Sequence, residues 1–272
     1  MKNILLPVHE DSGQEARLLA ALAVTRAVAG HLMCLDVIVP PTPLGFGLFG
    51  DYQGAASMIA LDSQQRSAAR NRARLEPRLG YEDIEWSWQE TMDFPAHAIR
   101  RAEMLADLVV LSARLDKAGS FELKHLCQRL AGSTGRAILA VPPPARELNL
   151  AGTVVIAWNG SSEVQRALRE AVPLLKLASE VVLLSIVDPM GPFAANDAAT
   201  YLSRHGIRPQ IYAADRLAGE HVCEVLLTHA QNLGASYIVL GAFHHPPTLE
   251  ALWGGVTHSM LASSDMPLLL SH

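Results

Sequence analysis

The apolar residues of this chain lie in short blocks, separated by longer stretches in which apolar and polar residues recur with helical spacing. The block from Val181 to Val187 contains one polar residue, Ser185. A nearly continuous apolar strand is typical of a parallel sheet that helices cover on both faces, whereas a half-exposed strand alternates between apolar and polar residues. The pattern therefore predicts an α/β fold with doubly wound, Rossmann-like sheets.

The same order of strands and helices occurs twice. In the first half we predict strands at Asn3–Val8, His31–Val39, Asp83–Gln89, Ala106–Ser112 and Ala137–Val141, and helices near Gln14–Ala29, Ala55–Leu79, Ala96–Leu105 and Glu122–Leu130. In the second half we predict strands at Thr153–Asn159, Glu180–Val187, Arg208–Ala213, Ala235–Gly241 and Pro267–Ser271, with a helix at Glu163–Ala178 after the first of them. An internal repeat of this length indicates two tandem domains, 1–147 and 148–272, each with a five-stranded parallel sheet and helices on both faces.

The first copy is the longer one. Equivalent positions are 150 residues apart at His9 and Asn159 but 129 residues apart at Ser112 and Gly241. The Pro/Gly-rich segment 40–50 accounts for the excess, and its composition does not favour a regular element. Three interpretations stay open for it: a loop packed on a neighbouring domain or subunit, a lid over a site, or a loop without function. The Pro-rich linker 142–147 is short and stiff.

Composition limits the functions of the chain. The sequence has 22 basic and 27 acidic side chains, a net charge of −5, and no stripe of Lys and Arg, so we expect no nucleic-acid partner. The apolar blocks are too short to span a membrane, which predicts a cytoplasmic protein. Cys34, Cys127 and Cys223 have no metal-ligand spacing, and we interpret them as packing residues in a reducing compartment.

A ligand site is expected where the winding of each sheet reverses, between its first and fourth strands, beyond their carboxyl ends. In the second half this edge carries Asn159-Gly160-Ser161, Val187-Asp188, Gly241 to His244, and Gly254 to Thr257. Glycines at the start of a helix let backbone N–H groups approach a phosphate, whose charge the helix dipole favours. The segments therefore predict an anion site in the second domain.

These motifs resemble the universal stress protein family. A strand that ends in Asn-Gly-Ser, followed later by Gly241 and, after His244 and nine more residues, by Gly254-Gly255-Val256-Thr257, is similar to that family's nucleotide-binding pattern. The resemblance covers essentially the whole chain as a tandem pair. It implies an ATP, ADP or AMP site with Mg²⁺ in the second domain. Adenine would lie near Asn159 and Val187, and the phosphates would lie against Gly241, Gly254, Gly255, Val256 and Thr257.

Two residues depart from the family pattern. Asn159 stands where nucleotide-binding members have an acidic residue, so it can form a hydrogen bond but carries no charge. His244 replaces a glycine, and its side chain either obstructs the phosphates or contributes a hydrogen bond or a positive charge. Trp158, beside this position, is either a core residue or an edge of the adenine pocket.

The corresponding site of the first domain is expected to be lost. His9-Glu10-Asp11 follows its first strand, and two carboxylates at the mouth of the crevice would repel phosphates. A metal or acid/base cluster at these residues is the alternative, but Asp11 or Ser12 is as readily the N-cap of the next helix. Gly132 is interpreted as the C-terminal cap of the last helix of this domain rather than as part of a phosphate loop.

The function predicted from these observations is a non-catalytic stress-response protein whose output is a binding state. Two alternatives remain. One is a weak ATPase, for which His244 is the one candidate general base, and the other is an interaction module that binds no nucleotide. A zinc site at His244 and His245, with His221 or His258, is weighed against solvated histidines, and no metal site is assigned.

The apolar last strands, Ile138–Val141 and Leu268–Leu270, are expected to pair with each other as an intramolecular pseudo-dimer or with another chain. A homodimer through the segment 46–49 or through helix faces, and an unknown protein partner, stay open.

Overall fold

The computed structural model describes residues 1–40, 50–114, 126–143, 148–187, 195–242 and 255–272, with the side chains of 50–56 excluded. Its first half contains β1 (Asn3–Val8), α1 (Gln14–Ala27), β2 (His31–Ile38), α2 (Gly50–Gly80), β3 (Glu85–Met92), α3 (Pro95–Ala102), the 3₁₀ turn η1 (Glu103–Leu105), β4 (Leu108–Ser112), α5 (Leu126–Ala131) and β5 (Ala137–Val141). Its second half contains β6 (Thr153–Ala157), α6 (Ser162–Leu175), β7 (Glu180–Val187), α7 (Asn196–Arg204), β8 (Gln210–Asp215), α8 (Val222–Asn232), β9 (Ala235–Gly241), α10 (Val256–Ser263) and β10 (Leu268–Ser271).

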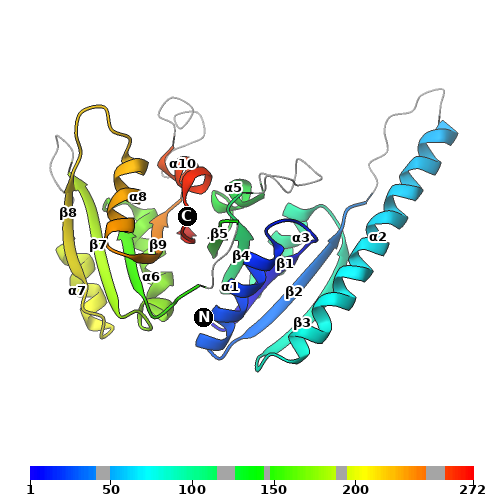
Figure 1. The fold of residues 1–272 in the computed structure, drawn as a ribbon, viewed down its shortest axis with the longest axis horizontal. Coiled ribbons are helices and arrows are strands. Elements are labelled where there is room, and N and C mark those ends of the chain that lie inside the picture. Colours follow the sequence, from blue (N-terminus) through cyan, green and yellow to red (C-terminus); the bar gives the residue numbers. More distant parts are fainter. Residues whose placement is uncertain (41–49, 115–125, 144–147, 188–194, 243–254) are drawn as a thin grey trace.

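The predicted elements are confirmed with shifts at their ends. The largest shift is in α2, which begins at Gly50 instead of Ala55. Its N-terminal part projects beyond the sheet, where no strand lies beneath it (Figure 1). Strand β8 ends two residues later than predicted, and β3 continues to Met92. Both are edge strands, so each has strand neighbours on one side only.

The ten strands of the described residues form one sheet in the order β3-β2-β1-β4-β5-β10-β9-β6-β7-β8. Every neighbouring pair is parallel except β5 and β10, which are antiparallel, with Leu269 opposite Leu139. The two last strands therefore pair with each other across the middle of the sheet, which confirms the predicted intramolecular pseudo-dimer. This pairing removes two apolar edges that would otherwise be open to other chains.

The strand registers confirm the repeat. Ile4 on β1 pairs with Leu108 on β4, and Val154 on β6 pairs with Tyr237 on β9. These are the offsets of 150 and 129 residues that the sequence gives for the two halves. In each half the first strand lies between the second and the fourth, so the winding reverses between strands one and four, as predicted.

Two hydrophobic cores lie on opposite faces of the sheet, and both extend across the boundary between the halves. One core contains side chains from α1, α2, α6 and α7. The other contains side chains from α3, α5, α8 and α10. Adjacent residues at the junction alternate between them: Leu269 points into the first core, whereas Leu268 and Leu270 point into the second. The halves therefore share their apolar packing as well as their backbone pairing.

Some sequence predictions fall on residues outside the described ranges, namely the segment 41–49, the first four residues of the helix predicted at Glu122–Leu130, most of the linker (144–147), Asp188, His244, His245 and Gly254. The proposed domain boundary at 147/148 lies between β5 and β6 and stays a prediction. Cys34, Cys127 and Cys223 are buried free thiols, as their interpretation as packing residues requires. Among the described residues, none of the helices combines the length and the apolar character of a membrane span.

Candidate functional site in the C-terminal half

The turn between β6 and α6 is held by two polar side chains. The side-chain oxygen of Asn159 accepts a hydrogen bond of 3.1 Å from the amide of Ser161, and the hydroxyl of Ser161 accepts one of 3.3 Å from the amide of Val164. Gly160, between them, has a φ of 72°, a left-handed conformation that costs glycine little. Asn159 is exposed at the carboxyl edge of the sheet, but one of its oxygen lone pairs already serves the turn.

Gly241 lets the first turn of α6 approach the end of β9. A Cβ atom added at this glycine would lie 2.6 Å from the amide nitrogen of Val164 and 2.7 Å from the Cβ of Glu163. No side chain fits into that space without a movement of the helix backbone. The glycine is therefore required for the packing of a helix against a strand, a role that is distinct from approach to a phosphate.

The N-terminus of α10 lies at the same edge. Gly255 is its N-cap residue and supplies no side-chain cap, and the first helical residue, Val256, is 37% exposed. The hydroxyl of Thr257 lies 3.4 Å from the carbonyl oxygen of Gly241, which places the first turn of α10 beside the end of β9. Backbone amides of a first helical turn have no partner within the helix, so they favour an anion.

The structure thus brings together Asn159, Gly241, Gly255, Val256 and Thr257 around the ends of β6 and β9. Val187 is the last residue of β7, the strand next to β6, and is partly exposed. The placement of His244 and Gly254 lies outside the described residues, so their part in the site stays a prediction.

A groove opens beside this turn, between α6 and α7. It has a volume of about 350 Å³, and its lining includes Trp158, Gly160, Leu168, Arg169, Asp197 and Tyr201. Trp158 is 7% exposed and belongs to the core, and one part of it faces the groove. Its interpretation as an edge of an adenine pocket stays a prediction.

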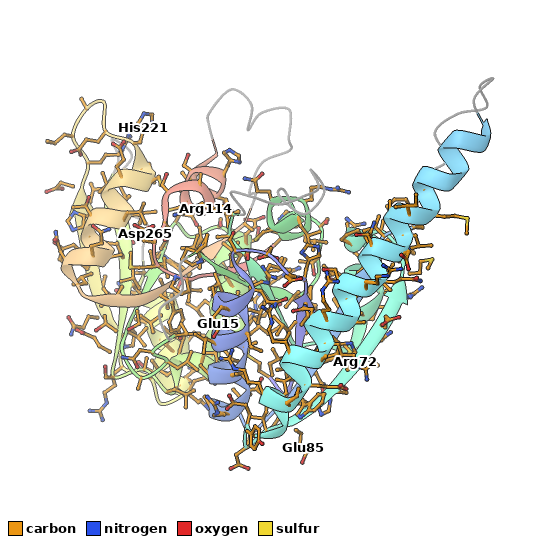
Figure 2. The ribbon with its side chains drawn as sticks, turned by 45° about the vertical axis from the view of Figure 1, so that its right-hand side comes forward. Glu15, Arg72, Glu85, Arg114, His221 and Asp265 are labelled. Atoms are coloured by element: carbon orange, nitrogen blue, oxygen red, sulfur yellow. The ribbon has the colours of Figure 1, made fainter. Side chains whose placement is uncertain are left out.

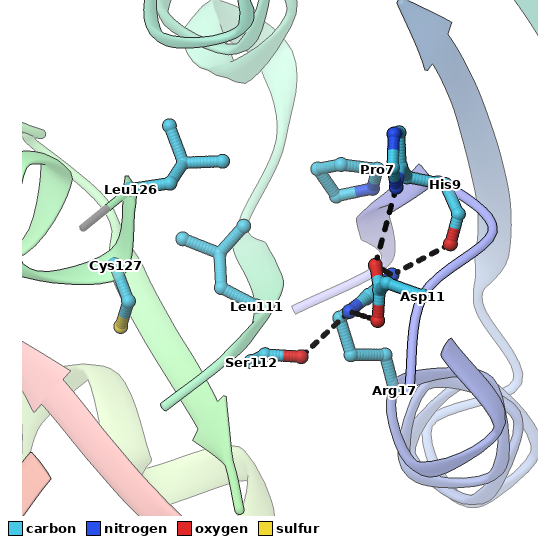
Figure 3. Close-up of a pocket in the computed structure, with 8 residues that line it drawn as sticks. All are labelled: Pro7, His9, Asp11, Arg17, Leu111, Ser112, Leu126 and Cys127. Carbon is cyan, nitrogen blue, oxygen red and sulfur yellow. Dashed lines mark hydrogen bonds and ion pairs between the residues drawn. The ribbon is translucent and has the colours of Figure 1, made fainter. Parts of the chain in front are cut away.

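At the equivalent place in the N-terminal half, Arg17, Asp11 and Ser112 form a hydrogen-bonded network on one side of a small pocket (Figure 3). Arg17 Nη1 donates hydrogen bonds to Asp11 Oδ1 at 2.9 Å and to Ser112 Oγ at 2.6 Å, and Arg17 Nη2 donates to Asp11 Oδ2 at 2.7 Å. The side chains of Arg17 and Asp11 are 5% and 3% exposed. The remaining cavity, next to Leu111 and Cys127, is about 30 Å³, the share of one water molecule in the liquid.

This network changes the electrostatics expected for the crevice. Burial alone raises the pKa of Asp11, but His9 at 3.5 Å, the hydrogen bonds and charge of Arg17 and the amide of Gly13 together hold that pKa well below its usual range. Asp11 is therefore a carboxylate whose charge Arg17 balances, so its repulsion of phosphates is not the main obstacle. Arg17, Asp11 and Ser112 narrow this crevice, and the loss of a ligand site there stays a prediction.

Asp11 and Ser12 are not the N-cap of α1, contrary to the prediction. Gly13 is the N-cap residue, and Asp11 instead accepts a hydrogen bond of 2.7 Å from its amide. Asp11 lies two residues before the N-cap, and both of its carboxylate oxygens accept hydrogen bonds from Arg17. Gly132 directly follows α5, which ends at Ala131, and this agrees with its predicted terminal position.

A second set of polar contacts closes the space between α1 and α2. The amides of Gln14 and Asn71 exchange two buried hydrogen bonds of 2.8 and 2.9 Å, and Arg78 binds the carboxylate of Glu15 through two more, at 2.7 and 2.8 Å. Helices α1 and α2 correspond in chain order to α6 and α7. The interhelical space that is an open groove in the C-terminal half is thus bridged by side chains in the N-terminal half.

The sequence reasoning missed Arg17 and the groove. The sequence did contain a signal for the network. Arg17 follows Asp11 by six residues in the first turn of a predicted helix, and the equivalent residue of the second half is Ala167. Ser112 likewise has Gly241 as its equivalent, so the second half cannot form the same network. The groove gives no such signal, because Trp158, Arg169 and Asp197 come from three separate elements.

The other candidate clusters do not assemble in the described part of the chain. No group of three or more His, Cys, Asp or Glu side chains there is placed to hold a metal ion. His221, at the start of α8, is exposed whereas Cys223 is buried, so they do not face the same way. A Cys/His nucleophilic pair is therefore not formed by these two residues.

Comparison with known proteins gives a consistent result. Residues 151–272 match the family described as "Universal stress protein family". A universal stress protein from Archaeoglobus fulgidus DSM 4304 is 16% identical with a TM-score of 0.71, over 99% of this chain and 96% of that one. A functionally unknown protein from Pseudomonas aeruginosa PAO1 (14% identity, TM-score 0.58, 100% and 92% coverage) and a putative universal stress protein from Pseudomonas aeruginosa UCBPP-PA14 (14%, 0.56, 98% and 91%) share the two-domain fold. No curated protein sequence matches the chain.

Proposed function

Because the chain belongs to the universal stress protein family, by sequence in residues 151–272 and by fold over almost its whole length, we propose that it is a non-catalytic stress-response protein whose C-terminal domain binds an adenine nucleotide. The N-terminal domain is a scaffold in this proposal and binds none. The output of the protein is its binding state, which a partner protein reads.

One observation carries the proposal. The turn after β6, the end of β9 and the N-terminus of α10 meet at the reversal point of the C-terminal sheet, with an open groove beside them. At the equivalent place the N-terminal half holds the Arg17–Asp11 ion pair. Two copies of one fold thus differ at the point where α/β sheets receive ligands.

The nucleotide is assigned to the residues that the family pattern indicates. The base lies near Asn159 and Val187. The phosphates lie at the first turn of α10, where Gly255, Val256 and Thr257 offer backbone amides, and Gly241, His244 and Gly254 complete the phosphate loop. We assign Mg²⁺ to the phosphates of the nucleotide itself, the usual arrangement for this ion.

Calorimetric titration with ATP, ADP and AMP, with and without Mg²⁺, tests the proposal. The sharpest variants are Val256→Glu and Val256→Gln, which have nearly the same shape and differ by one negative charge. Glutamate at the first position of a helix suits the helix dipole, so α10 is retained. It also places a charge against the phosphates, so Val256→Glu should bind ATP at least about 10-fold more weakly than Val256→Gln.

Two results would contradict the proposal. Absence of heat and of any thermal shift at millimolar ATP, ADP and AMP with the unmodified protein removes nucleotide binding. Sustained release of phosphate from ATP, with many turnovers per protein molecule, contradicts the non-catalytic part and favours the weak ATPase.

A further inference from the structure

Two acidic residues face each other on the outer pair of strands of the N-terminal half. Asp36 on β2 pairs in register with Glu90 on the edge strand β3, so both side chains lie on the same face of the sheet. Asp36 is 5% exposed, whereas Glu90 is exposed. Among the described residues, Asp36 Oδ2 has no hydrogen-bond partner. A buried carboxylate without a partner is costly, and a like charge opposite it adds to the cost.

Helix α2 lies over this face of β2 and β3 and brings one arginine to the acidic pair (Figure 2). The guanidinium of Arg72 lies 5.6 Å from the ring centroid of Trp88, two residues before Glu90. It attracts both Asp36 and Glu90. However, Arg72 is exposed and already donates hydrogen bonds of 2.8 and 3.1 Å to Glu76 Oε1. One guanidinium thus serves three carboxylates, so it does not neutralise Asp36.

The other titratable neighbours of Asp36 do not reverse this balance. Cys34, two residues earlier on the same face of β2, has a pKa raised to about 12 by burial, so it is a neutral thiol. His9, at the end of β1, attracts the carboxylate, but it also lies 3.5 Å from Asp11. Burial and the charge of Glu90 outweigh these attractions and raise the pKa of Asp36 to about 6. The carboxyl group therefore changes its charge close to neutral pH.

The part of α2 that covers Asp36 is weakly anchored. Gln64 accepts a hydrogen bond of 3.1 Å from the amide of Val39, just beyond β2, and Arg72 lies over β3. Asp36 therefore lies beneath the turns between them. The side chains of 65–70 in these turns are exposed or half-buried, and β3 has a strand neighbour on one side only. Segments with few buried apolar contacts open at a lower free energy than the core, so β3 and α2 can separate from β2 without global unfolding.

We propose that β3 and α2 form a proton-responsive unit, which stays closed over Asp36 while its carboxyl group carries a proton and loosens when that group is ionised. Opening of the unit exposes the carboxylate to water, so ionisation favours the open form. The C-terminal half lacks this device, because Ser185 on β7 and Ala213 on β8 occupy the positions of Asp36 and Glu90. The inference does not depend on nucleotide binding, and it gives the N-terminal domain a response to acid in addition to its role as a scaffold.

Amide hydrogen exchange of the full-length protein at pH 5 and pH 7.5, corrected for the intrinsic effect of pH on exchange, tests the inference. Both values lie above the range in which Asp11 loses its stabilising effect. Protection of 65–80 and of β3 should fall about 10-fold from pH 5 to pH 7.5. This is the change implied by a pKa of about 6 for Asp36 in the closed unit and about 4 in the open unit. Protection of β1 and β4, and of α7 and β8 in the C-terminal half, should change less.

Three variants locate the titrating group. Asp36→Asn keeps the size of the side chain and should remove the fall in protection, and Glu90→Gln should reduce it. Asp62→Asn, at an exposed aspartate on α2, is the control and should leave the fall unchanged. A fall that persists in Asp36→Asn would come from another group, such as His9, and overturns the inference. Unchanged protection of β3 and α2 in the unmodified protein overturns it too, as does an equal fall in β1 and β4, which would indicate global unfolding.

Discussion

Arg114 of the N-terminal half donates a hydrogen bond of 2.8 Å from Nη1 to the carbonyl oxygen of Ser264 in the C-terminal half. The same nitrogen donates to Ala262 at 3.1 Å, and Nη2 lies 3.0 Å from the carboxylate of Asp265 (Figure 2). These acceptors lie at the end of α10, where a helix has unpaired carbonyl groups and favours a cation. Arg114 of the N-terminal half therefore stabilises the C-terminal end of α10. The N-terminal end of the same helix contributes to the candidate anion site of the C-terminal half.

Arg114→Ala should lower the free energy of unfolding by about 1–2 kcal/mol, because Arg114 is partly exposed and its hydrogen bonds go to backbone carbonyls. Amide exchange in 257–263 should accelerate more than in the rest of the C-terminal half. The control is Arg66→Ala, which removes an exposed pair with Asp62 within α2 and should cost less than about 0.5 kcal/mol. Unchanged exchange in α10 would mean that Arg114 does not hold the helix.

Arg17→Met should be strongly destabilising, by about 3–5 kcal/mol, because it leaves the carboxylate of Asp11 buried without its partner. Chemical denaturation at pH 7 measures this change. The double variant Arg17→Met with Asp11→Asn removes the charge as well and should recover part of the loss. If the single variant were as stable as the unmodified protein, the crevice of the N-terminal half would not depend on this ion pair.

The ion pair between Arg17 and Asp11 also predicts that the stability of the protein falls in acid. The pKa of Asp11 is lower in the folded than in the unfolded protein, so the unfolded state binds a proton first as pH falls. The stabilisation is therefore complete above about pH 4, the ordinary pKa of aspartate, and is lost as pH falls further. The double variant should show a smaller loss of stability below pH 4 than the unmodified protein in the same titration.

Asp36 should have the opposite effect on the pH dependence of stability. Burial and the neighbouring charge of Glu90 raise its pKa to about 6, against the attraction of His9 and Arg72. The folded state therefore binds a proton more tightly than the unfolded state. Asp36 contributes stability below about pH 4, and this contribution is lost as pH rises through 6. Asp36→Asn should remove a fall in unfolding free energy of roughly 2–3 kcal/mol between pH 4 and pH 7. If Asp36→Asn showed the same fall in unfolding free energy between pH 4 and pH 7, the fall would come from another titratable group.

Gly241→Ala should destabilise the C-terminal half by about 1–3 kcal/mol or more, because the added methyl group meets the backbone of α6 at 2.6 Å. Gly80→Ala is the matched control: nothing lies within 4 Å of its added Cβ, and it ends a helix, where alanine is neutral or favourable. Thermal unfolding of the two variants makes the comparison. Equal melting temperatures would show that α6 moves away from Gly241 without cost.

The architecture could be predicted from the sequence because it follows from local patterns. Blocks such as Val181–Val187 are apolar on both faces, which indicates a parallel strand between two layers of helices. The repeated order of strands fixes the reversal point in each sheet, and the apolar last strands require a partner, which each finds in the other. The element ends were less predictable where context decides them, as at the start of α2.

The candidate site was predictable only in outline. Asn159, Gly241 and Thr257 are far apart in the chain, but the topology alone brings the ends of their strands and helix together. Gly241 was assigned to a phosphate from the family pattern, whereas the structure also gives it the role of admitting α6. That role depends on the distance between β9 and α6 in the folded protein, which cannot be derived from the spacing of residues in the sequence.

The sequence by itself determined that this protein is a tandem α/β repeat, because hydrophobic periodicity is a property of neighbouring residues. Only the tertiary structure decided which side chains line the equivalent crevices of the two copies. Arg17, Asp11 and Ser112 are ordinary polar residues until β1, α1 and β4 bring them within hydrogen-bond distance, and Trp158, Arg169 and Asp197 form a groove only because α6 and α7 lie side by side. Whether side chains fill or leave a space depends on three-dimensional packing, which a linear pattern does not contain.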